Sequence, residues 1–152
     1  MSRRDQIVMT AGEVEEFLAG RRTMDVATIG AGGQPHLVAM WYGFHQGAPA
    51  FWTYGRSQKA VNLRRDPRLT CLVEEGDSYD TLRGVELVGR GVLLDDPADV
   101  LAVGASVVER YTGPLDDSAR AGLARTAAKR VAVRIEVERV VSWDHRKLGG
   151  AY

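Results

Sequence analysis

The sequence predicts a mainly β fold of the α+β class, an antiparallel β-barrel with helices at its periphery. Three observations carry this prediction. Apolar stretches separated by short, glycine-containing turns run through residues 24–54, as in antiparallel hairpins. The apolar stretch 82–94 has glycine at positions 84, 89 and 91, which is expected where a strand bends at a barrel corner. Residues 131–138 alternate between apolar and polar, the pattern of a half-buried strand.

Length and composition fit a single domain over residues 1–152. The chain is 45% hydrophobic, which is enough for a sizeable core. Its 20 basic and 20 acidic residues give a formal charge of zero, so no overall field draws it to nucleic acid or to an anionic membrane. Cys71 is the only cysteine and no basic, apolar leader opens the chain, so we expect a reducing cytoplasm as the compartment.

The first predicted element is a helix after Thr10. Thr10-Ala11-Gly12-Glu13 forms a capping box, in which the Thr10 hydroxyl and the Glu13 carboxylate each satisfy a free backbone N–H. Val14, Phe17 and Leu18 then fall on one face. The helix is therefore expected to pack by that side.

Strands follow at residues 24–29, 35–44 and 49–54, with turns at residues 30–34 and 46–48 between them. Two further strands are expected at residues 68–73 and 82–94. Asp96 followed by Pro97 marks the start of an amphipathic helix that runs to about Tyr111. A second helix is expected at residues 116–129, although Gly122 weakens the pattern, and the alternating strand at 131–138 closes the barrel.

Residues 54–67 lie between two predicted strands and contain a short helix. Ser57 is a suitable N-cap, and Asp66-Pro67 ends the helix because a residue before proline disfavours the helical region. Arg56 and Lys59 lie at the helix start, whose free N–H groups and partial positive charge attract anions. We call Arg56, Ser57, Lys59 and the helix start the phosphate cradle. The alternative interpretation is a capped surface helix with solvated basic residues.

Residues 55–62, followed by Asp66-Pro67-Arg68, resemble the phosphate-binding signature of the pyridoxamine phosphate oxidase-like split β-barrel superfamily. The order of elements fits as well, including Gly33-Gln34-Pro35 at the start of the second strand, so the resemblance covers nearly the whole chain. It extends to the actinobacterial branch that uses the deazaflavin coenzyme F420 and includes biliverdin reductases. Residues 57–62 and 143–147 carry this closer likeness.

The resemblance implies a six-stranded split β-barrel that forms a homodimer, with two cofactors in grooves between the subunits. In this superfamily the cofactor phosphate lies in the cradle and the ring lies along the second and third strands. The cofactor-binding residues implied here are Arg56, Ser57, Lys59, Asn62, Pro35, His36, Val38, Met40, Trp52 and Thr53. Asn62 is expected to orient the phosphate or the loop. A dimer is also expected because apolar side chains on both faces of residues 37–44 need a second surface to cover them.

The choice of cofactor depends on departures from the superfamily pattern. Residues 74–77 and 82–85 differ from those of pyridoxamine phosphate oxidases proper, so vitamin B6 oxidation is not expected. FMN and F420 both present a phosphate to the cradle, but F420 adds an anionic oligoglutamate tail. Arginines that could bind this tail if they converge, or that are otherwise solvated, are Arg21, Arg22, Arg64, Arg65 and Arg68. We predict F420, with FMN as the alternative.

The activity implied is an F420H2-dependent reduction, in which hydride passes from the reduced deazaflavin to a quinone, enone or tetrapyrrole acceptor. The alternatives are an FMN-dependent oxidoreductase and a non-catalytic protein that carries a cofactor or a tetrapyrrole. No catalytic residue is assigned. His36 could donate a proton or a hydrogen bond at the ring edge, or be a strand histidine satisfied by the backbone.

Other candidate groups have simpler interpretations. His36, His45 and His145 lack the spacing of metal ligands, so no metal is predicted. Cys71 is expected to be a small buried apolar residue. Trp143 lies in a terminal segment that often reaches the neighbouring subunit's site in related dimers, and whether it does so here stays open. Aromatic residues suited either to stacking a flat ring or to the core and interface are Trp41, Tyr42, Phe44, Trp52 and Tyr54.

Overall fold

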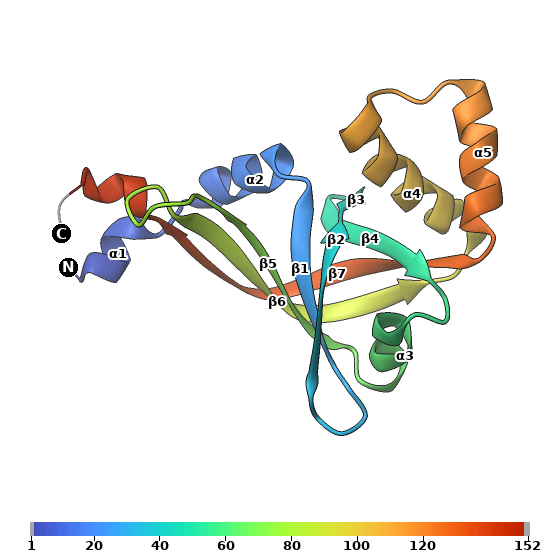
Figure 1. Ribbon diagram of the computed structural model, residues 1–152, viewed down its shortest axis with the longest axis horizontal. Helices are drawn as coiled ribbons and strands as arrows, with labels where there is room; N and C mark the ends of the chain where they lie inside the picture. Colours follow the sequence, from blue (N-terminus) through green and yellow to red (C-terminus); the bar gives the residue numbers. More distant parts are fainter. Residues whose placement is uncertain (1, 151–152) are drawn as a thin grey trace.

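The computed structural model describes residues 2–150 and shows a curled antiparallel sheet with helices around it (Figure 1). Its strands are β1 (Thr23–Ile29), β2 (Pro35–Trp41), β3 (Gly43–His45), β4 (Ala48–Tyr54), β5 (Arg68–Glu75), β6 (Arg83–Leu94) and β7 (Arg130–Asp144). Its helices are α1 (Arg3–Ile7), α2 (Ala11–Gly20), α3 (Gln58–Arg65), α4 (Pro97–Thr112), α5 (Asp117–Ala127) and the 3-10 helix η1 (His145–Leu148). The mainly β class and the antiparallel pairing are confirmed.

The seven strands form one sheet in the order β2-β1-β5-β6-β7-β4-β3. The edge strands β2 and β3 are separated in the chain by Tyr42 alone, so the sheet has to curl until its two edges lie next to each other. The single strand predicted at residues 35–44 is therefore wrong, and its division gives seven strands where six are implied. The division occurs because the partner strand changes at Tyr42: its N–H still donates to the Arg22 carbonyl at 3.1 Å, next to β1, whereas Gly43 pairs with Ala50 of β4.

Two helices precede β1, and only the second is predicted. At α2 the Thr10 hydroxyl accepts from the Glu13 N–H at 3.2 Å and the Glu13 carboxylate accepts from the Thr10 N–H at 2.6 Å, so the capping box is confirmed. Ser2 and Asp5 form the same motif at α1. Because α1 is short and has no buried residue, it lacks the apolar pattern from which a helix is predicted.

The sheet has a core on each side at β4. Phe51 lies in the core inside the curled sheet, together with Tyr42 and Met24. Trp52, the next residue along β4, lies in a second core with Val103 of α4. Alternate residues of a strand face opposite sides of a sheet, so β4 is the wall between the two cores.

Helices α4 and α5 lie together at one end of the sheet (Figure 1). The Asp96 side chain accepts from the Ala98 N–H at 2.9 Å and Pro97 is the first helical residue, which confirms the predicted start of α4. At the other end of α4, Arg110 donates to the carbonyls of Leu18 and Ala19 at 3.2 Å each. The guanidinium thereby satisfies free carbonyls at the end of α2 and joins the two helices.

The longest strand pair, β6 and β7, contains the bend that the glycines predict. The pair has a bulge between Val88 and Gly89. A Cβ at Gly89 would lie 2.0 Å from the Glu136 carbonyl oxygen, so only glycine fits at this position.

On β5, Cys71 is fully buried as predicted, and burial raises the pKa of its thiol to about 12. Within residues 2–150 no helix is both long and apolar enough to cross a membrane.

Candidate anion-binding site

The predicted cradle lies where β2 and the end of β4 each have one edge that pairs with no other strand. Strand β3 pairs with β4 only at Ala48, Pro49 and Ala50, so residues 51–54 of β4 pair with β7 alone. Strand β2 pairs with β1 alone. Helix α3 follows the end of β4 and lies under that part of the sheet in Figure 1. The barrel is thus split between β2 and β4, and α3 begins at the β4 side of the split.

Two side chains at the start of α3 and one from β4 form a short hydrogen-bonded chain. Ser57 is the N-cap, and its hydroxyl accepts from the Ala60 N–H at 3.4 Å. The Thr53 hydroxyl donates to the Ser57 hydroxyl at 3.1 Å and accepts from the Lys59 ammonium at 3.2 Å. The structure therefore brings together Ser57, Lys59 and Thr53 of the predicted set.

Lys59 is unusual because its charge is buried without a carboxylate. It is 9% exposed, and the Thr53 hydroxyl is its one hydrogen-bond partner among residues 2–150. Burial lowers the pKa of Lys59 below its ordinary value, and the positive charge of Arg130 lowers it further. An ammonium has three donors, so two remain free for a ligand. A buried cation in this state is stabilised by an anion.

Arg56 lies beside this chain on the surface. Its side chain is exposed, and it has no hydrogen-bond or ion-pair partner within the described part of the chain. The guanidinium fork is thus free to approach the start of α3, where the first N–H groups of the helix also lack partners.

Asn62 has a different place in the site. It is fully buried, its Nδ2 donates to the Thr28 hydroxyl at 3.0 Å, and its Oδ1 accepts from the Gln58 side chain at 2.8 Å. The first contact holds α3 against β1, and the second lies within α3. Of the two predicted roles, orientation of the phosphate or of the loop, these contacts favour the second.

The predicted residues of β2 divide between the two faces of that strand. His36, Val38 and Met40 are half-buried, whereas Pro35 is exposed on the other face. On β1, the three half-buried residues have buried register partners. These partners are Thr28, Val26 and Met24, in the same order. Because cross-strand partners share a face, these three side chains lie on the core side of the split. The His36 Nδ1 atom is buried and has no hydrogen-bond partner within residues 2–150, so the backbone does not satisfy it.

Trp52 and Thr53 are also on opposite faces of their strand. The Trp52 ring packs on Gly104 of α4 so closely that a Cβ at position 104 would lie 2.6 Å from it. The ring is therefore committed to the second core, and only the Trp52 backbone faces the split. The other aromatic residues are dispersed as well: Trp41 stacks on Tyr111 with ring centroids 3.6 Å apart, and Tyr42 is fully buried.

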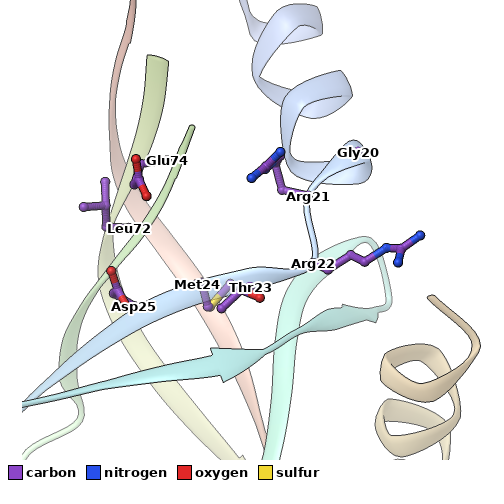
Figure 2. Close-up of a pocket in the computed structure, with 8 residues that line it drawn as sticks. All are labelled: Gly20, Arg21, Arg22, Thr23, Met24, Asp25, Leu72 and Glu74. Carbon is purple, nitrogen blue, oxygen red and sulfur yellow. The ribbon is translucent and has the colours of Figure 1, made fainter. Parts of the chain in front are cut away.

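The arginines considered for an acidic tail do not converge. Arg21 and Arg22 lie at the end of α2, beside a pocket of about 410 Å³, and Figure 2 shows their side chains directed to different sides. Arg21 donates to the Glu75 carboxylate at 3.0 Å. The other three have local partners: Arg64 donates to the Gly55 carbonyl at 2.6 Å, Arg65 to the Ile29 carbonyl, and Arg68 to the Asp66 carboxylate at 2.6 Å.

Arg130 is the residue that sequence reasoning missed. It opens β7 opposite Tyr54, and its guanidinium lies 4.4 Å from the ring centroids of both Trp52 and Tyr54. Its Nε is buried without a hydrogen-bond partner in the described chain. The alternating pattern begins at Val131, so Arg130 falls just outside it. Only the pairing of β7 with β4 places this residue at the end of β4 that leads into the cradle.

The C-terminal segment packs on its own chain. The Trp143 ring covers Gly84, where a Cβ would lie 2.4 Å from the ring. Asp144 pairs with Arg146 at 2.6 Å, which lowers the pKa of that carboxyl, and Lys147 pairs with Glu13 at 2.7 Å. That this segment reaches the site of a neighbouring subunit stays a prediction.

Within residues 2–150 no three His, Cys, Asp or Glu side chains are grouped as metal ligands.

Comparison with known proteins supports the family and the fold. The sequence profile described as pyridoxamine 5′-phosphate oxidase matches residues 10–144. The crystal structure of the conserved hypothetical protein Rv2991 from Mycobacterium tuberculosis is 49% identical, with a TM-score of 0.94 over 100% of this chain and 95% of that one. No curated protein gave a significant match.

Two more distant structures share the fold alone. One is an F420 reductase, 23% identical, with a TM-score of 0.64 over 84% of this chain and 94% of that one. The other is HutZ, the heme storage protein from Vibrio cholerae, 18% identical, with a TM-score of 0.69 over 88% of this chain and 94% of that one. The same fold thus occurs in proteins described by different ligands.

Proposed function

The chain belongs to the pyridoxamine 5′-phosphate oxidase family, and on that premise we propose that it is an F420H2-dependent reductase acting on a small conjugated acceptor of the quinone, enone or tetrapyrrole type. The family and the fold support a flavin- or deazaflavin-type oxidoreductase. The observation that carries the proposal is Lys59, a buried ammonium without a carboxylate at the start of α3. A cofactor phosphate supplies the missing negative charge.

The phosphate end of the cofactor fits the cradle by its donors. Lys59 supplies a point charge, Arg56 a planar fork, and the α3 N-terminus backbone N–H groups, all of which suit phosphate oxygens. Thr53 and Ser57 position the Lys59 ammonium rather than neutralise it. The cradle is therefore prepared before the ligand arrives, so less ordering is required on binding.

The ring end fits the core side of β2. Val38 and Met40 offer half-buried apolar contact, and the unpartnered Nδ1 of His36 is available for a polar atom of the ring or the acceptor. When bound, the reduced deazaflavin supplies the hydride. The protein's part is to hold the two flat molecules together and to keep water from the split.

The preference for F420 over FMN depends on residues 57–62 and 143–147, which resemble the F420-using branch. FMN remains the alternative because its phosphate would use the same donors. A carrier of cofactor or tetrapyrrole is the second alternative, since the fold also occurs in a heme storage protein.

We also propose that the working form is a homodimer. The edge strand β2 presents Leu37 and Trp41 on its outer face, 67% and 55% exposed, and Val140 of β7 is 45% exposed. Exposed apolar side chains along a free sheet edge are covered in stable proteins. A second copy covers this face and closes the open side of the split. Gel filtration with light scattering should give a dimer for the wild type and a monomer for Leu37→Asp, with Ala102→Asp on the exposed face of α4 as the control.

The function is tested by titrating the purified protein with F420 and with FMN while following cofactor fluorescence. We expect saturable binding of F420, followed by oxidation of F420H2 in the presence of a quinone or enone. Binding of FMN without binding of F420 would show that the cofactor is FMN and not F420. Tight binding of F420 with no turnover on any quinone, enone or tetrapyrrole would indicate the carrier.

A further inference from the structure

Arg130 is a charged residue that the proposed phosphate site does not use. Its guanidinium is held against the rings of Trp52 and Tyr54 at 4.4 Å from each centroid. Two ring contacts fix the guanidinium in place at little further cost in entropy. Yet it has no carboxylate partner in the described chain, and its buried Nε has no acceptor. A fixed cation without a counter-charge is a feature of an anion-binding group.

The two chain segments that meet at the β4–β7 pair beside Arg130 carry no negative charge of their own. The two segments that meet here, residues 46–65 and 118–135, contain no acidic residue, although the whole chain has as many acidic as basic residues. The Gly55 N–H donates to the Lys129 carbonyl at 3.1 Å, so Lys129 and Arg130 border the turn that leads into α3. Arg130 is also close enough to Lys59 to lower the pKa of that ammonium. The positive charge that these two segments contribute therefore extends beyond the cradle.

Arg130 and Lys59 nevertheless lie on opposite faces of β4. Lys59 contacts Thr53, whereas Arg130 contacts Trp52 and Tyr54, and alternate residues of a strand face opposite sides. A single phosphate held by Lys59 and the α3 N-terminus is thus on the other side of the strand from Arg130. A ligand satisfies both cations when it carries two anionic groups and extends across the turn at residues 55–57.

We propose that Arg130 is a second anion anchor, which binds a carboxylate on an extension beyond the cofactor phosphate and so selects a tailed phosphodiester over a ligand that ends in a simple phosphate. This inference rests on the proposed function, because F420 has such a tail and FMN does not. It assigns the selection to one residue of β7 rather than to the five arginines of α2, α3 and β5.

The test compares two ligands on three variants of the full-length protein. Arg130→Met keeps an unbranched side chain that can pack on the rings and removes the charge. It should weaken F420 binding roughly tenfold or more, the value of one charge-assisted hydrogen bond, and change FMN binding by less than about twofold. Arg130→Lys keeps the charge and should restore part of the F420 affinity. Arg134→Met, on the same strand and face but near Gln46, is the matched control and should change neither.

The outcomes separate the two proposals. Equal losses for F420 and FMN in Arg130→Met would place Arg130 on the shared phosphate or in the scaffold and overturn the anchor. Unchanged F420 affinity would overturn it as well. If the wild type binds FMN and does not bind F420, the proposed function fails first and the selection of a tailed ligand fails with it. Thermal melting of each variant shows whether a loss reflects unfolding.

Discussion

The Asn62 amide donates to the Thr28 hydroxyl at 3.0 Å inside a fully buried contact, and this bond joins the cradle helix to the first strand. The two residues are 34 positions apart in the chain. Through this contact the orientation of α3, and with it the direction of its N-terminus, depends on β1. The proposed phosphate site is thus built on the barrel rather than on a flexible loop.

Asn62→Ala is expected to destabilise the protein by roughly 1–3 kcal/mol, because it leaves the buried Thr28 hydroxyl without its donor. Urea unfolding followed by tryptophan fluorescence measures this. Val61→Ala is the control, since Val61 lies on the exposed side of the same helix and should lose less than about 1 kcal/mol. A smaller effect for Asn62 than for Val61 would refute the anchoring role.

Lys59→Met should have opposite effects on binding and on stability. Phosphate affinity should fall roughly tenfold, because a charge-assisted hydrogen bond is lost. The free energy of unfolding should rise, because the variant no longer buries an ammonium without a counter-charge. Phosphate protection against thermal unfolding measures the first effect and urea unfolding the second. Reduced stability together with unchanged phosphate protection would contradict the assignment.

The pH dependence of the same variant follows from the lowered pKa of Lys59. The folded protein binds this proton less tightly than the unfolded chain, so the unfolded state holds more protons as pH approaches the ordinary lysine value of 10.5. The wild type should therefore gain stability from this group as pH rises toward 10.5, and the gap to Lys59→Met should narrow. A difference in free energy of unfolding that stays constant over alkaline pH would show that burial does not lower the pKa of Lys59.

Gly104 and Gly122 should respond to alanine in opposite ways although both are in helices. A Cβ at Gly104 would lie 2.6 Å from the Trp52 ring, so Gly104→Ala should cost roughly 1–3 kcal/mol by overpacking. At Gly122 the nearest atom is an Arg125 nitrogen at 3.8 Å, so Gly122→Ala should stabilise by up to about 1 kcal/mol through helix propensity. Thermal melts of the two variants give the comparison.

The Cys71 thiol should be inert in the folded protein. It is fully buried and burial raises its pKa to about 12, so almost no thiolate forms near neutral pH. Ellman's reagent should label it only at the rate of unfolding, and fully in denaturant. Rapid labelling of the native protein would show that β5 opens locally.

Local signals in the sequence predict the secondary structure well. The capping box at Thr10, the Asp96-Pro97 start, the Ser57 cap and the alternation at residues 131–138 each depend on neighbours within a few positions. The same reasoning fails at Tyr42, where the apolar pattern continues but the partner strand changes from β1 to β4. A change of partner strand leaves no mark in periodicity, because the side chains on either side remain apolar.

By itself, the sequence determined that a capped helix with Arg56 and Lys59 follows a strand, which is a local pattern of residue types. The tertiary structure decided what that helix faces. It buried Lys59 against Thr53, used Asn62 for the scaffold, turned the Trp52 ring into the second core, and placed Arg130 at the end of β4. These outcomes depend on strand pairing between residues far apart in the chain, and pairing is set by packing of the whole sheet rather than by any one segment.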